Sequence, residues 1–267
     1  MQRHVRSCVL ILGLAAMPAA AWADDGDGSP CAALPSYAAL KSALIAAVQT
    51  ETSGLDFQMW GTIVNRDGIV CAIAFSGANR GSQWPGSRAI SAQKANTANA
   101  FGLDGLALST ANLYSATQPG GSLFGLQHSN PVDTDVAYGG SPSAYGTAHD
   151  PMVGRRIGGV NVFGGGLGLY NAQHKIVGGV GVSGDTSCAD HMIAWRVRAN
   201  LGLDHLGTVI GGPAKLFASD PTHPDNIIFD ITPNPDGGTG KSATGFGHPT
   251  CGINDTTDPL SLPPVSP

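Results

Sequence analysis

The sequence predicts a single α+β domain in which helices pack on an antiparallel sheet. Three observations lead to this fold class. Residues 57–76 have the pattern of a β-hairpin, and a second pair of strands follows at 160–182. Helical patterns lie before, between and after these pairs, at 35–50, 87–101 and 187–201. Strands in antiparallel pairs with helices between them are typical of an α+β sandwich.

The first half of the chain supplies one hairpin and two helices. Leu40, Leu44 and Val48 recur at helical spacing within 35–50, and Pro35 suits the first helical position. Strands are expected at 57–65 and 69–76, joined by a turn in which Gly68 takes the left-handed conformation. A helix is predicted at 87–101 and a short helix at 109–117.

The second half begins with a long irregular loop, residues 127–158. A loop of this length in a compact domain is usually either functional or disordered. Strand pieces at 160–163 and 167–170 flank three glycines, and a strand follows at 176–182. Ser187 is expected to cap the next helix, with Asp190 as its capping-box partner. One further strand is expected at 227–231, and a frayed tail from Asp255.

The N-terminus has the pattern of a signal peptide over residues 1–23. Arg3 and Arg6 precede a short apolar run, and Ala21–Ala23 forms an A-x-A cleavage site. The apolar run is too short to span a membrane, and no later stretch is apolar enough. We therefore expect a periplasmic or secreted protein with an α+β domain at 24–205 and a Gly/Pro-rich extension at 206–267.

Composition and charge exclude several classes of protein and several kinds of partner. Charged residues make up 12% of the chain, and the composition excludes a coiled coil, a collagen and a membrane bundle. Without Arg3 and Arg6, 12 basic residues face 19 acidic ones, a net charge of −7 with His neutral. No basic patch is visible, which argues against nucleic acid and anionic membranes as partners.

Four cysteines remain after the signal peptide: Cys31, Cys71, Cys188 and Cys251. An even count in an exported chain predicts two disulfides, with three possible pairings. A helix that runs back along the first strand brings Cys31 near Cys71, which leaves Cys188 for Cys251. There is no C-x-x-C motif, so a thioredoxin-like site, a zinc ribbon and covalent haem attachment are not expected.

One glycine motif resembles a dinucleotide-binding fingerprint. Gly179, Gly181 and Gly184 match G-x-G-x-x-G between a strand and a helix, and Asp204 lies 20 residues further on. No βαβ unit continues from it, so close backbone packing is the alternative that we favour. The nearby Gly181–Asp185 segment fails the nucleophile-elbow pattern, because its fifth residue is Asp instead of Gly.

Five residues are candidates for a ligand pocket. His128 and His149 lie in the long loop with Tyr138 and Tyr145, and such a loop over a glycine-rich strand could hold a flat tetrapyrrole. The alternative is that these aromatic residues only pack the loop. No two histidines have the spacing of a local zinc site, although a site assembled through space stays open. The other candidates are Lys94, Asp190 and His191; a buried Lys94 would pair with a carboxylate or bind an anion.

Four segments in order along the chain resemble the GlcG/HbpS haem-binding family, and most closely its longer exported members. They are Ala92–Phe101 (AQKANTANAF), Gln118–Leu126 (QPGGSLFGL), Gly159–Phe163 and Ile176–Gly184 (IVGGVGVSG). The resemblance covers about residues 35–200; Lys94 matches the family's helix Lys, and Asp190 the acidic position of its last helix. The long loop, the four cysteines and the C-terminal extension depart from the family pattern, and no axial-ligand motif carries over.

The resemblance implies a profilin-like sandwich, a homo-oligomer and haem as cofactor. Our own candidates from the residues are His128 or His191 as axial ligand and Lys94 as the partner of a propionate. Some relatives degrade haem or act as redox sensors with a sensor-kinase partner. We therefore expect an exported haem-binding protein. The alternatives are a small-molecule sensor or carrier without haem, a haem-degrading enzyme, or an interaction module.

Overall fold

The computed structural model describes residues 29–207, 220–238, 240–255 and 258–267. The predicted signal peptide lies outside these residues. Within the described part of the chain, no helix combines the length and the apolar character that crossing a membrane requires.

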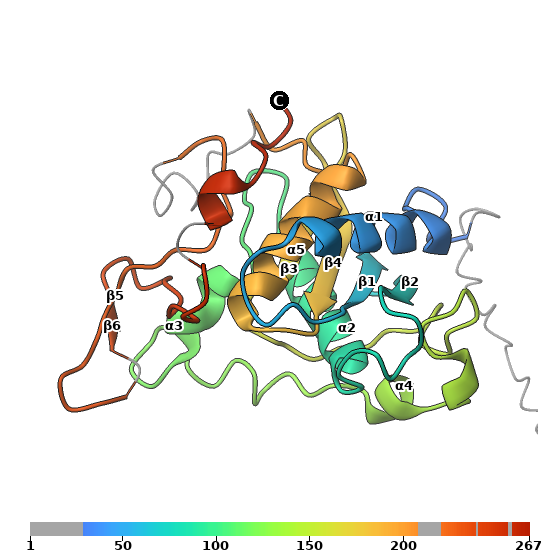
Figure 1. Ribbon diagram of the computed structural model, residues 1–267, viewed down its shortest axis with the longest axis horizontal. Coiled ribbons are helices and arrows are strands. Elements are labelled where there is room, and N and C mark those ends of the chain that lie inside the picture. Colours follow the sequence, from blue (N-terminus) through green and yellow to red (C-terminus); the bar gives the residue numbers. More distant parts are fainter. Residues whose placement is uncertain (1–28, 208–219, 239, 256–257) are drawn as a thin grey trace, which may run out of the picture.

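A four-stranded antiparallel sheet lies at the centre of the fold (Figure 1). Its strands are β1 (Trp60–Asn65), β2 (Val70–Phe75), β3 (Gly166–Tyr170) and β4 (Ile176–Ser183). The two predicted hairpins join side by side through β1 and β4, which gives the order β2-β1-β4-β3. Gly68 has a φ of +73° in the first turn, as predicted. The α+β class is confirmed.

Helices cover both faces of the sheet. On one face lie α1 (Tyr37–Thr50) and α5 (Ser187–Asn200), and their apolar side chains pack with Ile63, Val180 and Val182. On the other face lies α2 (Ser87–Phe101), whose bounds match the prediction. The sheet therefore separates two clusters of buried apolar side chains, one on each face. Side chains alternate along β1, which places Trp60 and Val64 in the cluster on the α2 side.

The glycines of β4 let the backbone of α2 approach the sheet. A Cβ atom on Gly181 would lie 2.0 Å from the Ser91 carbonyl oxygen, and one on Gly179 would lie 2.3 Å from the Ala95 carbonyl oxygen. Only glycine fits at such distances. The G-x-G-x-x-G pattern is therefore a packing feature, and α2 occupies the space over this strand where we expected a flat ligand.

The long loop 127–158 is ordered and contains α4 (Thr134–Tyr138) and the 3-10 turn η2 (Pro142–Ala144). Val136, Met152 and Ile157 join the core on the α2 side. Arg88 of α2 donates to both carboxylate oxygens of Asp150 and, through Nη1, to the Ala137 carbonyl at 2.8 Å. The loop is thus a structured cover for α2.

Several predicted boundaries are wrong. Pro35 does not take the first helical position, because α1 begins at Tyr37 and is capped by Ser36, whose side chain accepts from the Ala39 N–H. Thr186 caps α5 in place of Ser187, because its hydroxyl accepts from the Ala189 N–H; Asp190 therefore does not complete a capping box.

Other predicted elements are shorter or divided. The short helix becomes the 3-10 turn η1 (Ala111–Leu113) followed by α3 (Tyr114–Thr117). Residues 160–163 are not a strand, and the strand expected at 227–231 is reduced to β5 (Ile231–Thr232), which pairs with β6 (Lys241–Ser242).

The tail is not frayed where the structure describes it. It forms η3 (Asp258–Ser261), and Leu262 and Val265 are buried in the core.

Residues 220–238 and 240–255, here called the C-terminal segment, lie along α5 and beside α3 (Figure 1). The Cys188–Cys251 disulfide joins this segment to α5, and Cys31–Cys71 joins the start of the described chain to β2. Both predicted disulfides are present.

Candidate functional site

Buried polar side chains gather along α5, where one bonds to Lys94 of α2 and others face the C-terminal segment. Lys94 faces the sheet from α2, and its Nζ donates to the Asp190 carboxylate at 2.6 Å and to the Val182 carbonyl at 3.1 Å. The second Asp190 oxygen accepts from the Asp185 N–H at 2.9 Å. A buried Lys94 therefore takes the first of its two predicted roles, that of partner to a carboxylate.

Burial acts against both charges of this pair. Desolvation lowers the pKa of Lys94, and the attraction of Asp190 opposes that shift. Desolvation also raises the pKa of Asp190 to about 6, although Lys94 and the Asp185 N–H both favour the carboxylate. Neither side chain reaches water, so the attraction between the Lys94 ammonium and the Asp190 carboxylate is what chiefly keeps both groups charged.

His191 lies one residue further along α5 and faces the C-terminal segment. Its Nε2 lies 3.1 Å from both the Asn226 Oδ1 and the Ile227 N, and its Nδ1 is buried without a partner among the described residues. Burial lowers the pKa of His191 to about 4, so the ring is neutral at pH 7. Its enclosure leaves no open path from solvent to either ring nitrogen.

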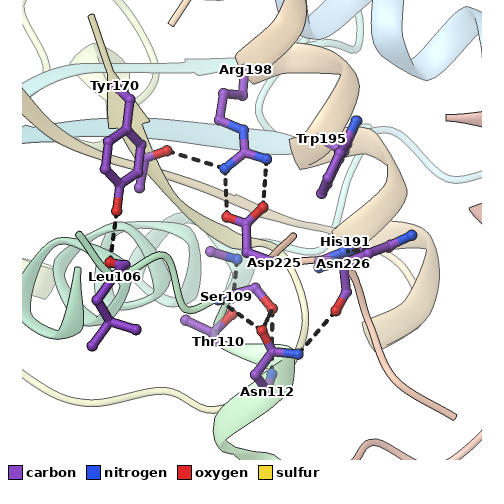
Figure 2. Close-up of polar contacts among 12 residues, drawn as sticks. Leu106, Ser109, Thr110, Asn112, Tyr170, His191, Trp195, Arg198, Asp225 and Asn226 are labelled. Carbon is purple, nitrogen blue, oxygen red and sulfur yellow. Dashed lines mark hydrogen bonds and ion pairs between the residues drawn. The ribbon is translucent and has the colours of Figure 1, made fainter. Parts of the chain in front are cut away.

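Arg198, about two turns beyond His191 on α5, is held by a fork of two hydrogen bonds. Its Nη1 and Nη2 donate to the two oxygens of Asp225 at 2.6 and 2.8 Å, and both side chains are fully buried (Figure 2). The guanidinium also lies over the Trp195 ring, 4.6 Å from its centroid. Asn112 donates to the Asn226 carbonyl at 3.0 Å, so η1 takes part in holding the same stretch.

The five candidate residues do not form one pocket. Lys94, Asp190 and His191 are buried around α5, whereas His128 and His149 are both exposed on the long loop. No recorded interaction joins the two groups within the described chain. Of the aromatic residues in the loop, Tyr145 donates to the Tyr138 carbonyl and stacks under Arg88, so it packs the loop as the alternative proposed.

A Ser–His contact at the start of α5 was not found from the sequence. The His248 Nδ1 donates to the Pro249 carbonyl at 2.7 Å, which leaves Nε2 to accept from the Ser187 hydroxyl at 2.7 Å. Burial lowers the pKa of His248 to about 4, which makes it a weak base. The two residues are 61 positions apart, and no local pattern connects them.

One cleft among the described residues lies elsewhere. It has a volume of about 700 Å³ and runs between the turn at 118–122 and the β5–β6 hairpin. Ser115, Lys241, Thr244 and Phe246 are among its lining residues. No histidine or cysteine lines any of the clefts recorded for the described residues.

The family model "Haem degrading protein HbpS-like" matches residues 38–198, which is more than half of the chain. The chain belongs to the HbpS-like family. The matched stretch includes the whole four-stranded sheet and α2; it begins one residue inside α1 and ends at Arg198, two residues before the end of α5. The C-terminal segment, with Asp225, Asn226 and His248, lies beyond it.

Three solved structures are similar to this chain. Protein ORFY of Klebsiella pneumoniae shares 24% identity over 62% of this chain and 90% of its own, with a TM-score of 0.42. A PduOC–haem complex shares 22% identity over 62% and 91%, with a TM-score of 0.43. A double mutant of HbpS from Streptomyces reticuli shares 20% identity over 70% and 99%, with a TM-score of 0.38. No curated protein matches the chain.

Proposed function

We propose that this protein is an exported haem-binding protein. Its membership of the HbpS-like family over residues 38–198 is the observation that carries the proposal. Export is supported by the signal-peptide pattern and by two disulfides, which form in oxidising compartments. A homo-oligomer and a sensor-kinase partner, which the family resemblance implies, belong to the same proposal.

The buried candidates do not fit a haem. Lys94 is bound to Asp190, His191 is enclosed by the C-terminal segment, and His248 has partners on both ring nitrogens. A haem needs an apolar contact surface and a free axial donor. Around α5 the one unpaired ring nitrogen in the described structure, the His191 Nδ1, is enclosed, so a haem cannot reach it.

The surface around His128 fits better. His128 is exposed, and Phe124, four residues earlier in the same run of turns, is 62% exposed. The imidazole would supply an axial nitrogen and the phenyl ring an apolar contact for the porphyrin. Of the two predicted axial ligands, we therefore assign this role to His128 and not to His191. Bound haem would supply redox chemistry at its iron.

A Soret titration of the chain without residues 1–23 tests this proposal. We expect saturation with haemin, and a loss of affinity of at least about tenfold in His128→Ala. His149→Ala is the matched control, because His149 is also exposed and should leave the affinity unchanged. An unsaturable rise in the wild-type protein would refute haem binding, and equal affinities in all three proteins would refute the assignment of His128.

Two other functions stay open to test. The cleft of about 700 Å³ is lined by hydroxyls, backbone groups and Lys241, which suits a small anionic or polyhydroxy ligand. Stabilisation by such a compound and none by haemin would favour a small-molecule sensor or carrier. Haem degradation would be favoured if bound haem is consumed when a reductant is added.

A further inference from the structure

The Cys188–Cys251 disulfide lies in a cluster of side chains that are typical metal ligands. One donor atom each of Cys188, Cys251 and His248 lie within 4.8 Å of one another. Asp255 adds a fourth group, since its Oδ2 is 3.7 Å from the Cys188 Sγ. Two sulfurs, one imidazole and one carboxylate from this cluster match the donor types and the number that zinc takes in proteins.

The charge of this cluster also favours a cation. Asp255 is 4% exposed, and it takes part in none of the ion pairs recorded for the described residues. Its Oδ2 accepts hydrogen bonds from the N–H groups of Cys251 and Gly252. A buried carboxylate without a counter-ion is unfavourable, and two thiolates beside it would add further negative charge.

We propose that Cys188, Cys251, His248 and Asp255 bind one zinc ion when the Cys188–Cys251 disulfide is reduced. A dithiol reductant attacks the half-buried Cys251 sulfur, the S–S bond breaks, and a second attack releases the reductant as its own disulfide. The protein gains two electrons and two protons as two thiols. Zinc then displaces both protons, and the two thiolates, the His248 nitrogen and the Asp255 oxygen complete four ligands.

The surroundings of His248 suit a ligand role. Both ring nitrogens have a partner at 2.7 Å, Ser187 on one side and the Pro249 carbonyl on the other. A metal would replace one of these hydrogen bonds, and the other would fix the orientation of the ring, as is usual for metal-bound histidines. His248 is buried, so the site would be closed to solvent, as structural zinc sites are.

Such a site would keep the C-terminal segment in place. Cys188 lies in the first turn of α5, whereas the other three ligands belong to the C-terminal segment. Zinc would therefore join the same two parts of the chain that the disulfide joins. In the reduced protein the ion would replace this covalent link and would add to the Arg198–Asp225 ion pair, which also joins the segment to α5.

Cobalt titration of the reduced protein without residues 1–23, in the absence of haem and under argon, tests the inference. We expect one equivalent to bind with thiolate-to-cobalt charge-transfer bands, and zinc to displace it. His248→Ala should weaken binding at least about tenfold. His149→Ala is the control. The oxidised form of each variant retains the disulfide, so its circular dichroism shows independently whether it is folded.

The second cysteine pair needs its own control. A Cys31→Ser/Cys71→Ser variant should retain the cobalt bands, because those cysteines lie outside the cluster. The inference is overturned if the reduced wild-type protein binds no cobalt. It is also overturned if His248→Ala binds as tightly as His149→Ala, or if the bands disappear with Cys31 and Cys71.

Discussion

Replacement of Lys94 by Met would leave the Asp190 carboxylate buried without its cation. The two side chains are 1% and 3% exposed and their charged atoms lie 2.6 Å apart. Removal of one partner from a buried ion pair costs about 3–5 kcal/mol of unfolding free energy, because the remaining charge is desolvated and uncompensated. We therefore expect Lys94→Met to lose about that amount at pH 8, measured by urea denaturation.

Lys175→Met is the matched control for this prediction. Lys175 pairs with Asp104 at nearly the same distance, 2.8 Å, but the two side chains are 63% and 50% exposed. Water screens such a pair, so its loss should leave the unfolding midpoint within error of the wild type. A second control, Lys94→Met/Asp190→Leu, removes both charges and should recover part of the lost stability.

The loss in Lys94→Met should also depend on pH. The pKa of Asp190 is about 6 in the native protein against 3.8 in the unfolded chain, and it rises further without Lys94. The native state then binds more protons than the unfolded state, so stability increases as the pH falls through this range. The difference from wild type should be smaller at pH 5.5 than at pH 8. Equal losses in Lys94→Met and Lys175→Met would refute the reasoning.

Three further predictions concern stability. Burial lowers the pKa of His191 from 6.5 to about 4, so acidification from pH 6.5 to pH 4 should lower the unfolding free energy by up to about 3 kcal/mol. In urea denaturation, the unfolding free energy of His191→Gln should therefore depend less on pH than that of the wild type. Gly181→Ala would force a Cβ atom against the backbone of α2 and should lower the unfolding free energy by about 3 kcal/mol or more. A Cβ atom on Gly105 would have nothing within 4 Å, so Gly105→Ala should change the thermal midpoint little, and similar midpoints for the two variants would contradict the packing argument. Loss of Cys31–Cys71 through a double Ser variant should cost about 2–5 kcal/mol, and an unchanged denaturation curve would show that the bond contributes nothing.

Local patterns in the sequence predicted the elements that local interactions determine. The bounds of α2 and the turn at Gly68 follow from helix periodicity and from the conformational freedom of glycine. The cysteine pairing followed from the direction in which α1 runs relative to the first hairpin. The family resemblance, based on four short segments, agrees with the matched range 38–198.

Contacts between distant single residues could not be predicted. The partners of Arg198 and Ser187 lie 27 and 61 positions further along a Gly/Pro-rich stretch that shows no periodicity. The cap of α5 was assigned one residue too late, because Thr186 and Ser187 have equivalent hydroxyls and only the backbone geometry distinguishes them. The five candidate residues were grouped by chemistry, and chemistry does not show which helix face each one takes.

The position of the C-terminal segment also determines the order in which the protein can mature. A ribosome makes α5 before it makes Asp225, so newly synthesised chains carry Arg198 without its carboxylate partner for a time. The part of the chain that matches the HbpS-like family ends at Arg198, and it cannot complete its buried ion pair until Asp225 has also been made. Chaperones that recognise exposed faces of nascent domains would bind α5 before the C-terminal segment has been made. A chain that ends shortly after residue 205 would lack Asp225, so Arg198 would never gain this partner.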